Sequence, residues 1–143
     1  MATRPFPIDF ETVEPDSKPR CCLALAKDHP RADAADLESP VFACAPDEAL
    51  DAFIAAGLSE ARVTVVRRDA QTGQVELVQR SLLFRFPDYV TVEPVDLGAG
   101  HASLNIYSRA VLGYSDLGVN EKRVRRWLEA AAERLDQAAG NAK

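Results

Sequence analysis

Hydrophobic residues recur at helical spacing in two segments of the chain. In residues 45–59, Leu50, Phe53 and Ile54 form an apolar stripe along one side of a predicted helix. A second stripe lies in residues 121–137 and consists of Val124, Trp127, Leu128, Ala131 and Leu135. The spacing predicts a helix in each segment, with its apolar side packed on a sheet.

Between these helices, hydrophobic and polar residues alternate as in half-buried strands. The alternation predicts four strands, at residues 61–68, 75–86, 87–95 and 102–112. Short turns join consecutive strands, which favours antiparallel pairing. In the second strand the alternation changes parity, so we expect a bulge or a twist there. Four side chains of that strand are expected to share one face: Val78, Leu82, Phe84 and Phe86.

These elements predict an α+β fold, an antiparallel four-stranded meander with both helices on one face. The length of 143 residues suits one domain, which we place at residues 21–138. Residues 1–20 hold four prolines and predict an extended arm, and residues 139–143 predict a frayed tail. Two short apolar runs, CCLALA and VFACA, fit strands but are too short to assign.

Composition and charge predict a soluble cytoplasmic protein. The chain is 47% hydrophobic and 27% charged, and its net charge is −5. An acidic balance argues against a general affinity for nucleic acid or anionic lipid. The N-terminus lacks the apolar run of a signal peptide, and no apolar run approaches the length of a membrane span. We therefore expect neither a nucleic-acid partner nor a membrane partner.

The segment GYSDLGVN, residues 113–120, leads from the last strand into the last helix. Asn120 is a favoured N-cap residue for that helix. Asp116 has two alternative roles: it stabilises the turn and the helix dipole, or it pairs with Arg109 in a polar site. Alternation places Tyr107 and Arg109 on the outward face of the preceding strand.

The run NIYSRAVLGYSDLGVNEKRVRRWL closely resembles the C-terminal signature of a bacterial family, domain of unknown function 1499. The resemblance is ungapped from Ile106 to Leu128 and extends more weakly upstream to about residue 18. Family members often carry Ser-Arg where this chain has Ala110 and Val111, and Asn where it has Arg20. The resemblance implies no activity, but it implies that any polar pocket of the family is depleted here.

Most catalytic chemistries lack a matching motif. His29 and His101 lie far apart and neither has metal-ligand spacing, so we expect no metal site. Nucleophile-elbow, phosphate-loop and dinucleotide-binding motifs are missing, so we expect no catalytic residue and no cofactor. Cys21, Cys22 and Cys44 lack CxxC spacing and predict no disulfide framework. The basic run at residues 122–126 is either a solvated helix face or a holder of a phosphate-bearing or acidic partner.

The function that these patterns favour is non-catalytic binding of a small molecule or a protein at the junction of the last strand and the last helix. The candidate binding residues are Tyr107, Arg109, Tyr114, Ser115, Asp116, Asn120 and Arg123. The alternative is a hydrolase-like enzyme that uses Asp116 with Arg109. A cleft joining Tyr107, Arg109 and Asp116 would favour the enzyme, and a flat surface there would favour an interaction module.

Overall fold

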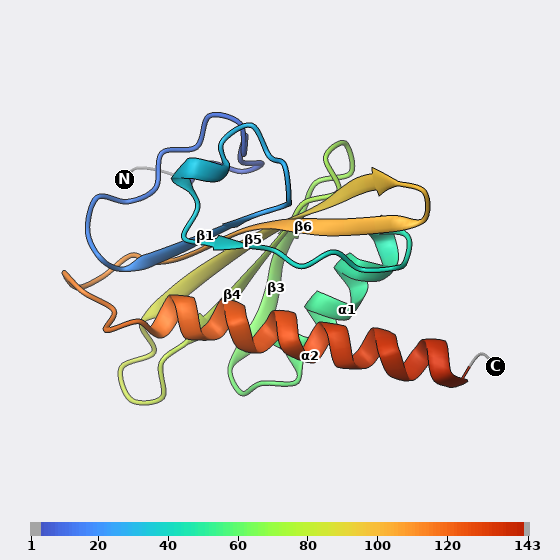
Figure 1. Ribbon diagram of the computed structural model, residues 1–143. Helices are drawn as coiled ribbons and strands as arrows, with labels where there is room; N and C mark the ends of the chain where they lie inside the picture. Colours follow the sequence, from blue (N-terminus) through green and yellow to red (C-terminus); the bar gives the residue numbers. More distant parts are fainter. Residues whose placement is uncertain (1–3, 142–143) are drawn as a thin grey trace.

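The computed structural model describes residues 4–141, which form two α-helices and six strands (Figure 1). The helices are α1 (Pro46–Leu58) and α2 (Val119–Asn141). The strands are β1 (Cys21–Leu25), β2 (Leu37–Glu38), β3 (Val63–Arg68), β4 (Val75–Arg80), β5 (Pro87–Gly98) and β6 (His101–Ala110). The fold class is α+β, as predicted. In residues 4–141, no helix is both long and apolar enough to cross a membrane.

The sheet is larger than the predicted four-stranded meander, and it is mixed. Strands β3 to β6 pair antiparallel in sequence order, as predicted. β1 adds to the free side of β6 antiparallel, and β2 pairs parallel with β1, so the order is β2-β1-β6-β5-β4-β3. Leu23 and Leu25 pack on one side of β1, and Cys22 and Ala24 pack on the other. A strand buried on both faces shows no polar alternation, which is why its sequence did not identify it.

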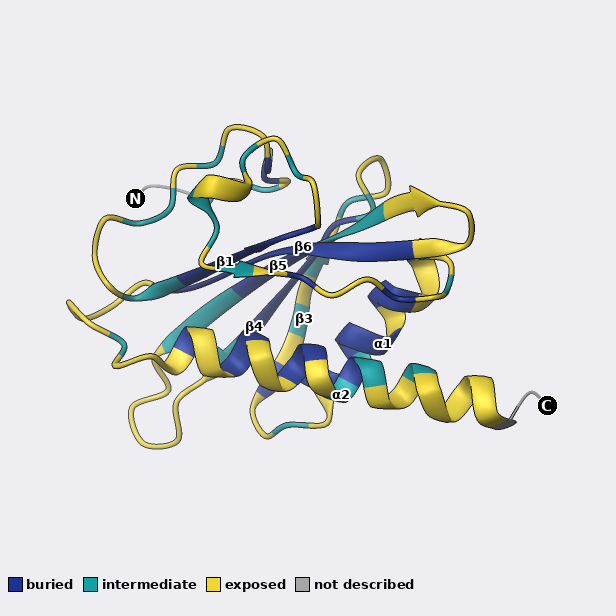
Figure 2. Cartoon of the chain, viewed as in Figure 1, coloured by how far each residue is buried: buried dark blue, intermediate teal, exposed yellow. Residues whose placement is uncertain are grey.

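Both helices cover one face of the sheet and enclose the main core (Figures 1 and 2). Trp127 of α2 is 1% exposed and lies edge-on against Phe53 of α1, with 5.6 Å between the ring centroids. Gly57 lets the two helices approach, because a Cβ at this position would lie 2.9 Å from the Trp127 ring. α2 extends beyond its predicted bounds at both ends. Its C-terminal end continues to Asn141, within the segment that was expected to be a frayed tail.

The N-terminal arm covers the opposite face of the sheet (Figure 1). Ile8 and Phe10 are buried there against the β1 leucines and Tyr107 of β6. The side chain of Gln74 fixes the arm, since it accepts a hydrogen bond from the Ile8 N–H and donates one to the Ile8 carbonyl. Outward-facing residues at the centre of the sheet, such as Tyr107 and Glu76, are therefore covered by this segment, whereas Thr64 and Val66 of β3 stay exposed.

Residues 81–86 form a projecting hairpin loop, so the prediction of a continuous strand to residue 86 was wrong. β4 ends at Arg80, and Arg85 has a left-handed backbone with φ 58°. Leu82, Phe84 and Phe86 are exposed, and the two phenylalanine rings stack on each other. The point in the sequence where the apolar residues switch from one alternating set of positions to the other corresponds to the end of β4. The irregularity of register that we expected there lies instead in β3, between Val65 and Arg67.

Candidate functional site

The alternation of β6 sends the predicted site residues to opposite faces of the sheet. Tyr107 packs under the N-terminal arm, and Arg109 lies on the same face. Ser108, between them, turns to the helix face and donates a hydrogen bond to Asn120 of α2. The predicted residues therefore form two groups that the sheet separates.

Arg109 does not pair with Asp116, which corrects the sequence-based hypothesis. Its guanidinium is buried, donates to Thr91 Oγ1 over 2.9 Å and lies 3.7 Å from the carboxylate of Glu76. Asp116 lies in the loop between β6 and α2, and its carboxylate accepts hydrogen bonds only from Gly118 and Asn120 among the described residues. The hydrolase-like alternative thus lacks the pair on which it depended.

Three arginines converge on Glu76 beneath the arm. Arg4 and Arg67 each place a guanidinium nitrogen 3.0 Å from Glu76 Oε1, and Arg109 approaches the other oxygen. Burial raises the pKa of Glu76, but hydrogen bonds from Arg4 and Arg67 outweigh burial, so the pKa lies below its ordinary value. This cluster ties the arm, through Arg4, to β3, β4 and β6.

On the helix face, Asn120 is a buried hydrogen-bonding hub and not the predicted N-cap. Its Oδ1 accepts from Ser108 Oγ over 2.6 Å and from Arg123 Nη1 over 2.7 Å. Its Nδ2 donates to Asp116 Oδ2 over 2.8 Å and to the Arg20 carbonyl over 3.2 Å. α2 begins one residue earlier, at Val119, and so Asn120 is already inside the helix.

Asp116 supplies the helix-capping contacts that we had assigned to Asn120. Its Oδ2 accepts the backbone N–H of Asn120 over 3.1 Å, and its Oδ1 accepts the N–H of Gly118 over 2.8 Å. A carboxylate in this position also favours the positive end of the helix dipole. Of the two alternatives for Asp116, the structure thus supports the structural role. Tyr114 and Ser115 lie in the same loop and are exposed.

Arg123 connects this hub to the sheet. Its Nη2 donates to Asp88 Oδ2 of β5 over 2.9 Å, and its Nε donates to Gln79 Oε1 of β4 over 2.7 Å. Burial lowers the pKa of Arg123, while the charge of Asp88 opposes that shift. Every polar atom of the guanidinium is held, so the side chain forms a fixed cationic wall.

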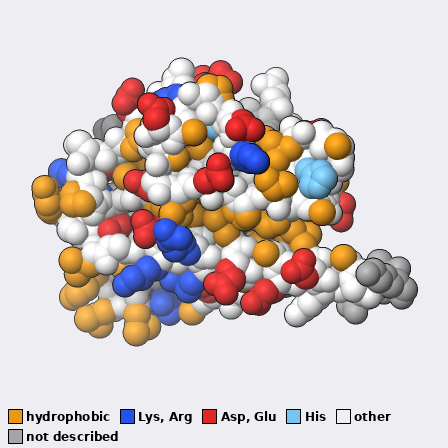
Figure 3. Space-filling view, in the orientation of Figure 1, with side chains coloured by type: hydrophobic (Ala, Val, Ile, Leu, Met, Phe, Trp, Pro, Cys, Tyr) orange, Lys and Arg blue, Asp and Glu red, His pale blue; other side chains and the backbone are white. Residues whose placement is uncertain are grey.

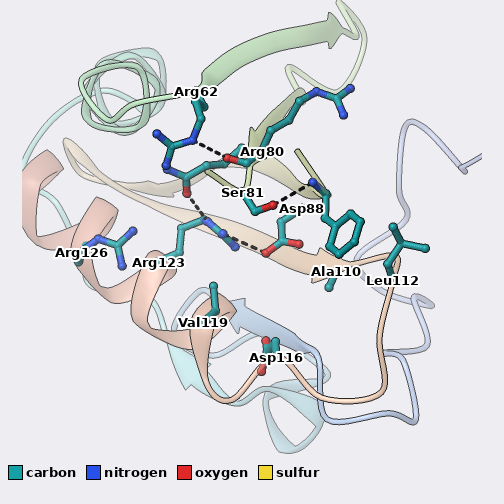
Figure 4. A pocket seen from close by; sticks show the side chains of 12 residues that line it. Arg62, Arg80, Ser81, Asp88, Ala110, Leu112, Asp116, Val119, Arg123 and Arg126 are labelled. Carbon is teal, nitrogen blue, oxygen red and sulfur yellow. Dashed lines mark hydrogen bonds and ion pairs between the residues drawn. The ribbon is translucent and has the colours of Figure 1, made fainter. Parts of the chain in front are cut away.

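A pocket of about 360 Å³ opens beside Arg123, at the end of the sheet where β4 ends and β5 begins (Figure 4). We call it the cationic pocket, because four arginines and two aspartates line it. Its lining residues are Arg62, Gln79, Arg80, Ser81, Phe86, Asp88, Ala110, Leu112, Asp116, Val119, Arg123 and Arg126. Only Asp116 and Arg123 of these were predicted as site residues. Leu112, Val119 and Arg126 lie near these two in the sequence, whereas Arg62, Gln79, Arg80, Ser81, Phe86 and Asp88 come from β3, β4, β5 and their connections and carry no motif that would have identified them.

The arginines of the cationic pocket differ in how far they are neutralised. Arg126 forms a two-fold contact with Glu60, whose pKa this hydrogen bonding lowers to about 2 despite partial burial. Arg62 and Arg80 are exposed and form no ion pair within residues 4–141. Their side chains donate only to backbone carbonyls, those of Arg80 and Arg85. Neither guanidinium group has a carboxylate partner, but only that of Arg62 stays beside Gln79 and Arg123; the Arg80 side chain extends away from Asp88 toward the hairpin loop (Figure 4).

Neither metal binding nor a disulfide is built into the described part of the chain. In residues 4–141, no three side chains among His, Cys, Asp and Glu gather closely enough to hold a metal. Cys21, Cys22 and Cys44 are free, and burial raises the pKa of the Cys22 thiol to about 12.

Because the three thiols are free, we expect a reducing agent to leave the melting temperature unchanged. A disulfide would contribute about 2–4 kcal/mol to stability. Thermal unfolding with and without dithiothreitol measures this, and a loss of several degrees in the reduced sample would show a cross-link.

Comparison with known proteins gives one match. A model of the family described as "Protein of unknown function (DUF1499)" matches residues 12–131. Searches of the curated proteins and of the solved structures give no significant match. The matched segment runs from the N-terminal arm to the middle of α2 and includes the hub at Asn120 and all residues of the cationic pocket. The chain belongs to the DUF1499 family.

Proposed function

We propose that this domain binds, without chemical conversion, a small anion or the anionic group of a larger ligand in the cationic pocket. The observation that carries the proposal is Arg62, an exposed guanidinium group at the pocket without an ion pair in residues 4–141, beside the fixed guanidinium of Arg123. Arg80, also without an ion pair, adds positive charge at the edge of the pocket. Planar guanidinium groups bind phosphate and carboxylate in two-fold geometry. The volume of about 360 Å³ lies at the small end of the range of ligand sites.

The surroundings favour binding over catalysis. Ser81 Oγ accepts the N–H of Phe86, Asp88 is paired with Arg123, and Asp116 caps α2. These groups support the walls of the pocket, and none of them adjoins a histidine or lysine base among its hydrogen-bond partners in residues 4–141. An adjacent base is a common means of activating a nucleophile, and these three groups have none. The fixed Arg123 and the available Arg62 and Arg80 suit charge recognition.

We expect inorganic phosphate to stabilise the protein, and the double variant R62Q/R80Q to lose this response. At a phosphate concentration ten times the dissociation constant, linkage predicts about 1.4 kcal/mol of stabilisation. For a chain of this size that corresponds to roughly 4 °C in melting temperature. The measurement is thermal unfolding in increasing phosphate, with sodium chloride added to keep the ionic strength constant.

Arg68→Gln is the matched control. Arg68 is an exposed arginine at the end of β3, whereas Arg62 and the pocket lie at the start of that strand. This variant should respond to phosphate as the wild type does. Glutamine at exposed positions changes stability little, so all three proteins should melt at similar temperatures without phosphate. An equal response in R62Q/R80Q and Arg68→Gln would exclude the pocket as the binding site.

A further inference from the structure

Large apolar side chains are exposed mainly at one end of the molecule. Thirteen such residues are exposed in residues 4–141, and nine of them lie in two segments, 82–86 and 111–119. We call these two segments together the apolar tip. Its members are Leu82, Leu83, Phe84, Phe86, Val111, Leu112, Tyr114, Leu117 and Val119. Isolated exposed apolar residues are ordinary, but a gathering of nine marks an interaction surface.

The two segments of the apolar tip lie side by side in the fold. β4, β5 and β6 reach the same end of the sheet, because Arg80 pairs with Pro87 and Asp88 pairs with Ala110. The hairpin loop after β4 and the loop after β6 both project from that end (Figure 1). Phe86 of one and Leu112 of the other line the cationic pocket together. The apolar tip therefore surrounds the pocket entrance.

The backbone holds these side chains outward at some cost. Leu117 is 85% exposed and has a left-handed backbone with φ 53°. Leu82 and Leu83 are 73% and 78% exposed at the turn of the hairpin. A non-glycine residue with positive φ costs energy, and features of this kind gather at functional sites. Nothing in the described chain covers this turn.

Unpaired cations surround the apolar tip, although the whole chain carries a net charge of −5. Arg62, Arg80, Arg85 and Lys122 form no ion pair within residues 4–141. We call these four residues the basic rim. Figure 3 shows hydrophobic side chains gathered at one end of the visible face, beside a cluster of lysine and arginine. The acidic character of the chain therefore does not extend to this end.

From this arrangement we infer that the apolar tip and the basic rim dock the domain on an anionic lipid membrane, with the phosphate of a lipid headgroup in the cationic pocket. This inference rests on the proposed binding of an anion in the cationic pocket and identifies that anion as a lipid phosphate. Aliphatic and aromatic side chains enter the boundary between headgroups and acyl chains, while nearby arginines bind lipid phosphate. The expectation of no membrane partner relied on the net charge of the whole chain, which does not describe this end.

The shape of the surface selects lipid over a protein partner. Eight of the nine apolar residues belong to the two loops, 81–86 and 111–118, that project from this end of the sheet (Figure 1), and six of the nine do not line the cationic pocket. The carboxylates beside them are engaged, Asp88 and Glu121 in ion pairs and Asp116 in the cap of α2, whereas the four cations of the basic rim have no ion pair within residues 4–141, and this excess of positive charge suits an anionic surface.

Vesicle sedimentation tests the inference, with two compositions that differ only in charge. One is equal parts phosphatidylglycerol and phosphatidylcholine, and the other is phosphatidylcholine alone. We expect wild type to sediment with the anionic vesicles at low ionic strength and to be released at about 1 M salt, where screening is nearly complete. It should remain in the supernatant with phosphatidylcholine.

Two pairs of variants separate the apolar and the cationic contributions. L83S/F84S should weaken vesicle binding at least tenfold, because each side chain loses apolar burial in the membrane. V41S/L97S, which alters exposed apolar residues outside the apolar tip, should bind as wild type does. R62Q/R80Q should bind about twenty-fold more weakly than Arg68→Gln, from the usual contribution of a basic residue near an anionic surface.

The outcomes distinguish this inference from the proposed function. L83S/F84S with weak vesicle binding and an intact response to inorganic phosphate would support both. Wild type that responds to phosphate but ignores anionic vesicles would overturn the lipid inference and leave the pocket proposal standing. Wild type that binds vesicles without any response to phosphate would refute the pocket proposal. It would also refute the placement of the lipid phosphate in the cationic pocket. A dimer in solution that L83S/F84S abolishes would overturn the inference in favour of a second copy.

Discussion

Replacing Trp127 with alanine will lower the free energy of unfolding by about 3–5 kcal/mol, the range for truncating a buried aromatic side chain. Trp127 is 1% exposed and contacts α1 through Phe53 and Gly57. Its removal leaves a cavity between the two helices and the sheet, and the rigid strands beneath cannot collapse into it. Urea unfolding measured by circular dichroism gives the free energy directly.

Gly57→Ala provides a second test of the same contact. We expect it to lower the free energy of unfolding, although glycine-to-alanine changes in helices usually raise it. In an exposed helix interior, alanine in place of glycine stabilises by about 1 kcal/mol. Here the added Cβ would lie 2.9 Å from Trp127 Cζ3, so we expect destabilisation. In the Trp127→Ala background the ring is gone, and Gly57→Ala should then stabilise. Stabilisation by Gly57→Ala in the wild-type background would contradict the close packing of α1 on α2.

Replacing Glu76 with glutamine will cost about 3–5 kcal/mol at neutral pH, because it breaks a buried ion cluster from one side. The carboxylate is fully buried, and Arg109 beside it is 8% exposed. Without the carboxylate, Arg109 keeps its charge in a dry environment and loses the contact that offsets its desolvation. The ion pair between Arg4 of the arm and the sheet is lost with it, although Arg4 keeps its contact with the Tyr89 ring. Exposed Glu129→Gln on α2 is the control and should change stability little.

The pH dependence gives a second readout for Glu76. Its pKa in the folded protein lies below the ordinary value of 4.5, so the unfolded chain binds the proton more readily. The resulting stability is present above pH 4.5 and is lost as the pH falls toward the folded pKa. Glu60, with a pKa of about 2, contributes to the same acid limb. Glu76→Gln should flatten this limb below pH 4.5, and an unchanged slope would show that Glu76 is not charged in the folded state.

The sequence predicted the elements whose apolar residues keep mainly to one face, even where polar side chains on the other face are buried as well, as in β4 and β6. α1, α2 and the strands β3 to β6 each place apolar residues on one face, so their periodicity is visible in a single sequence. β1 is covered on both sides and its partner β6 is distant in the chain, so neither alternation nor local pairing identified it. Residues 82–86 were taken for a strand because a sequence cannot distinguish exposed apolar residues from buried ones.

The candidate site was predicted in part, for a similar reason. Asp116, Asn120 and Arg123 lie close together in the sequence, and the structure also brings them together. Arg62 and Arg80 reach the pocket only through strand pairing, which no local motif reports. Arg109 was placed outward correctly, but the arm that covers it carries no periodic signal that would have assigned it to that face.

The two edges of the sheet offer little to an incoming strand. β2 is only two residues long, and β3 has its irregular register between Val65 and Arg67, followed by Arg68. Short, bulged and charged edges prevent two sheets from joining into one. The domain is thus protected against growth into strand-paired aggregates while its apolar side chains stay exposed at the tip. Backbone pairing along its flanks is therefore a poor route for association of this chain, which leaves contacts between side chains.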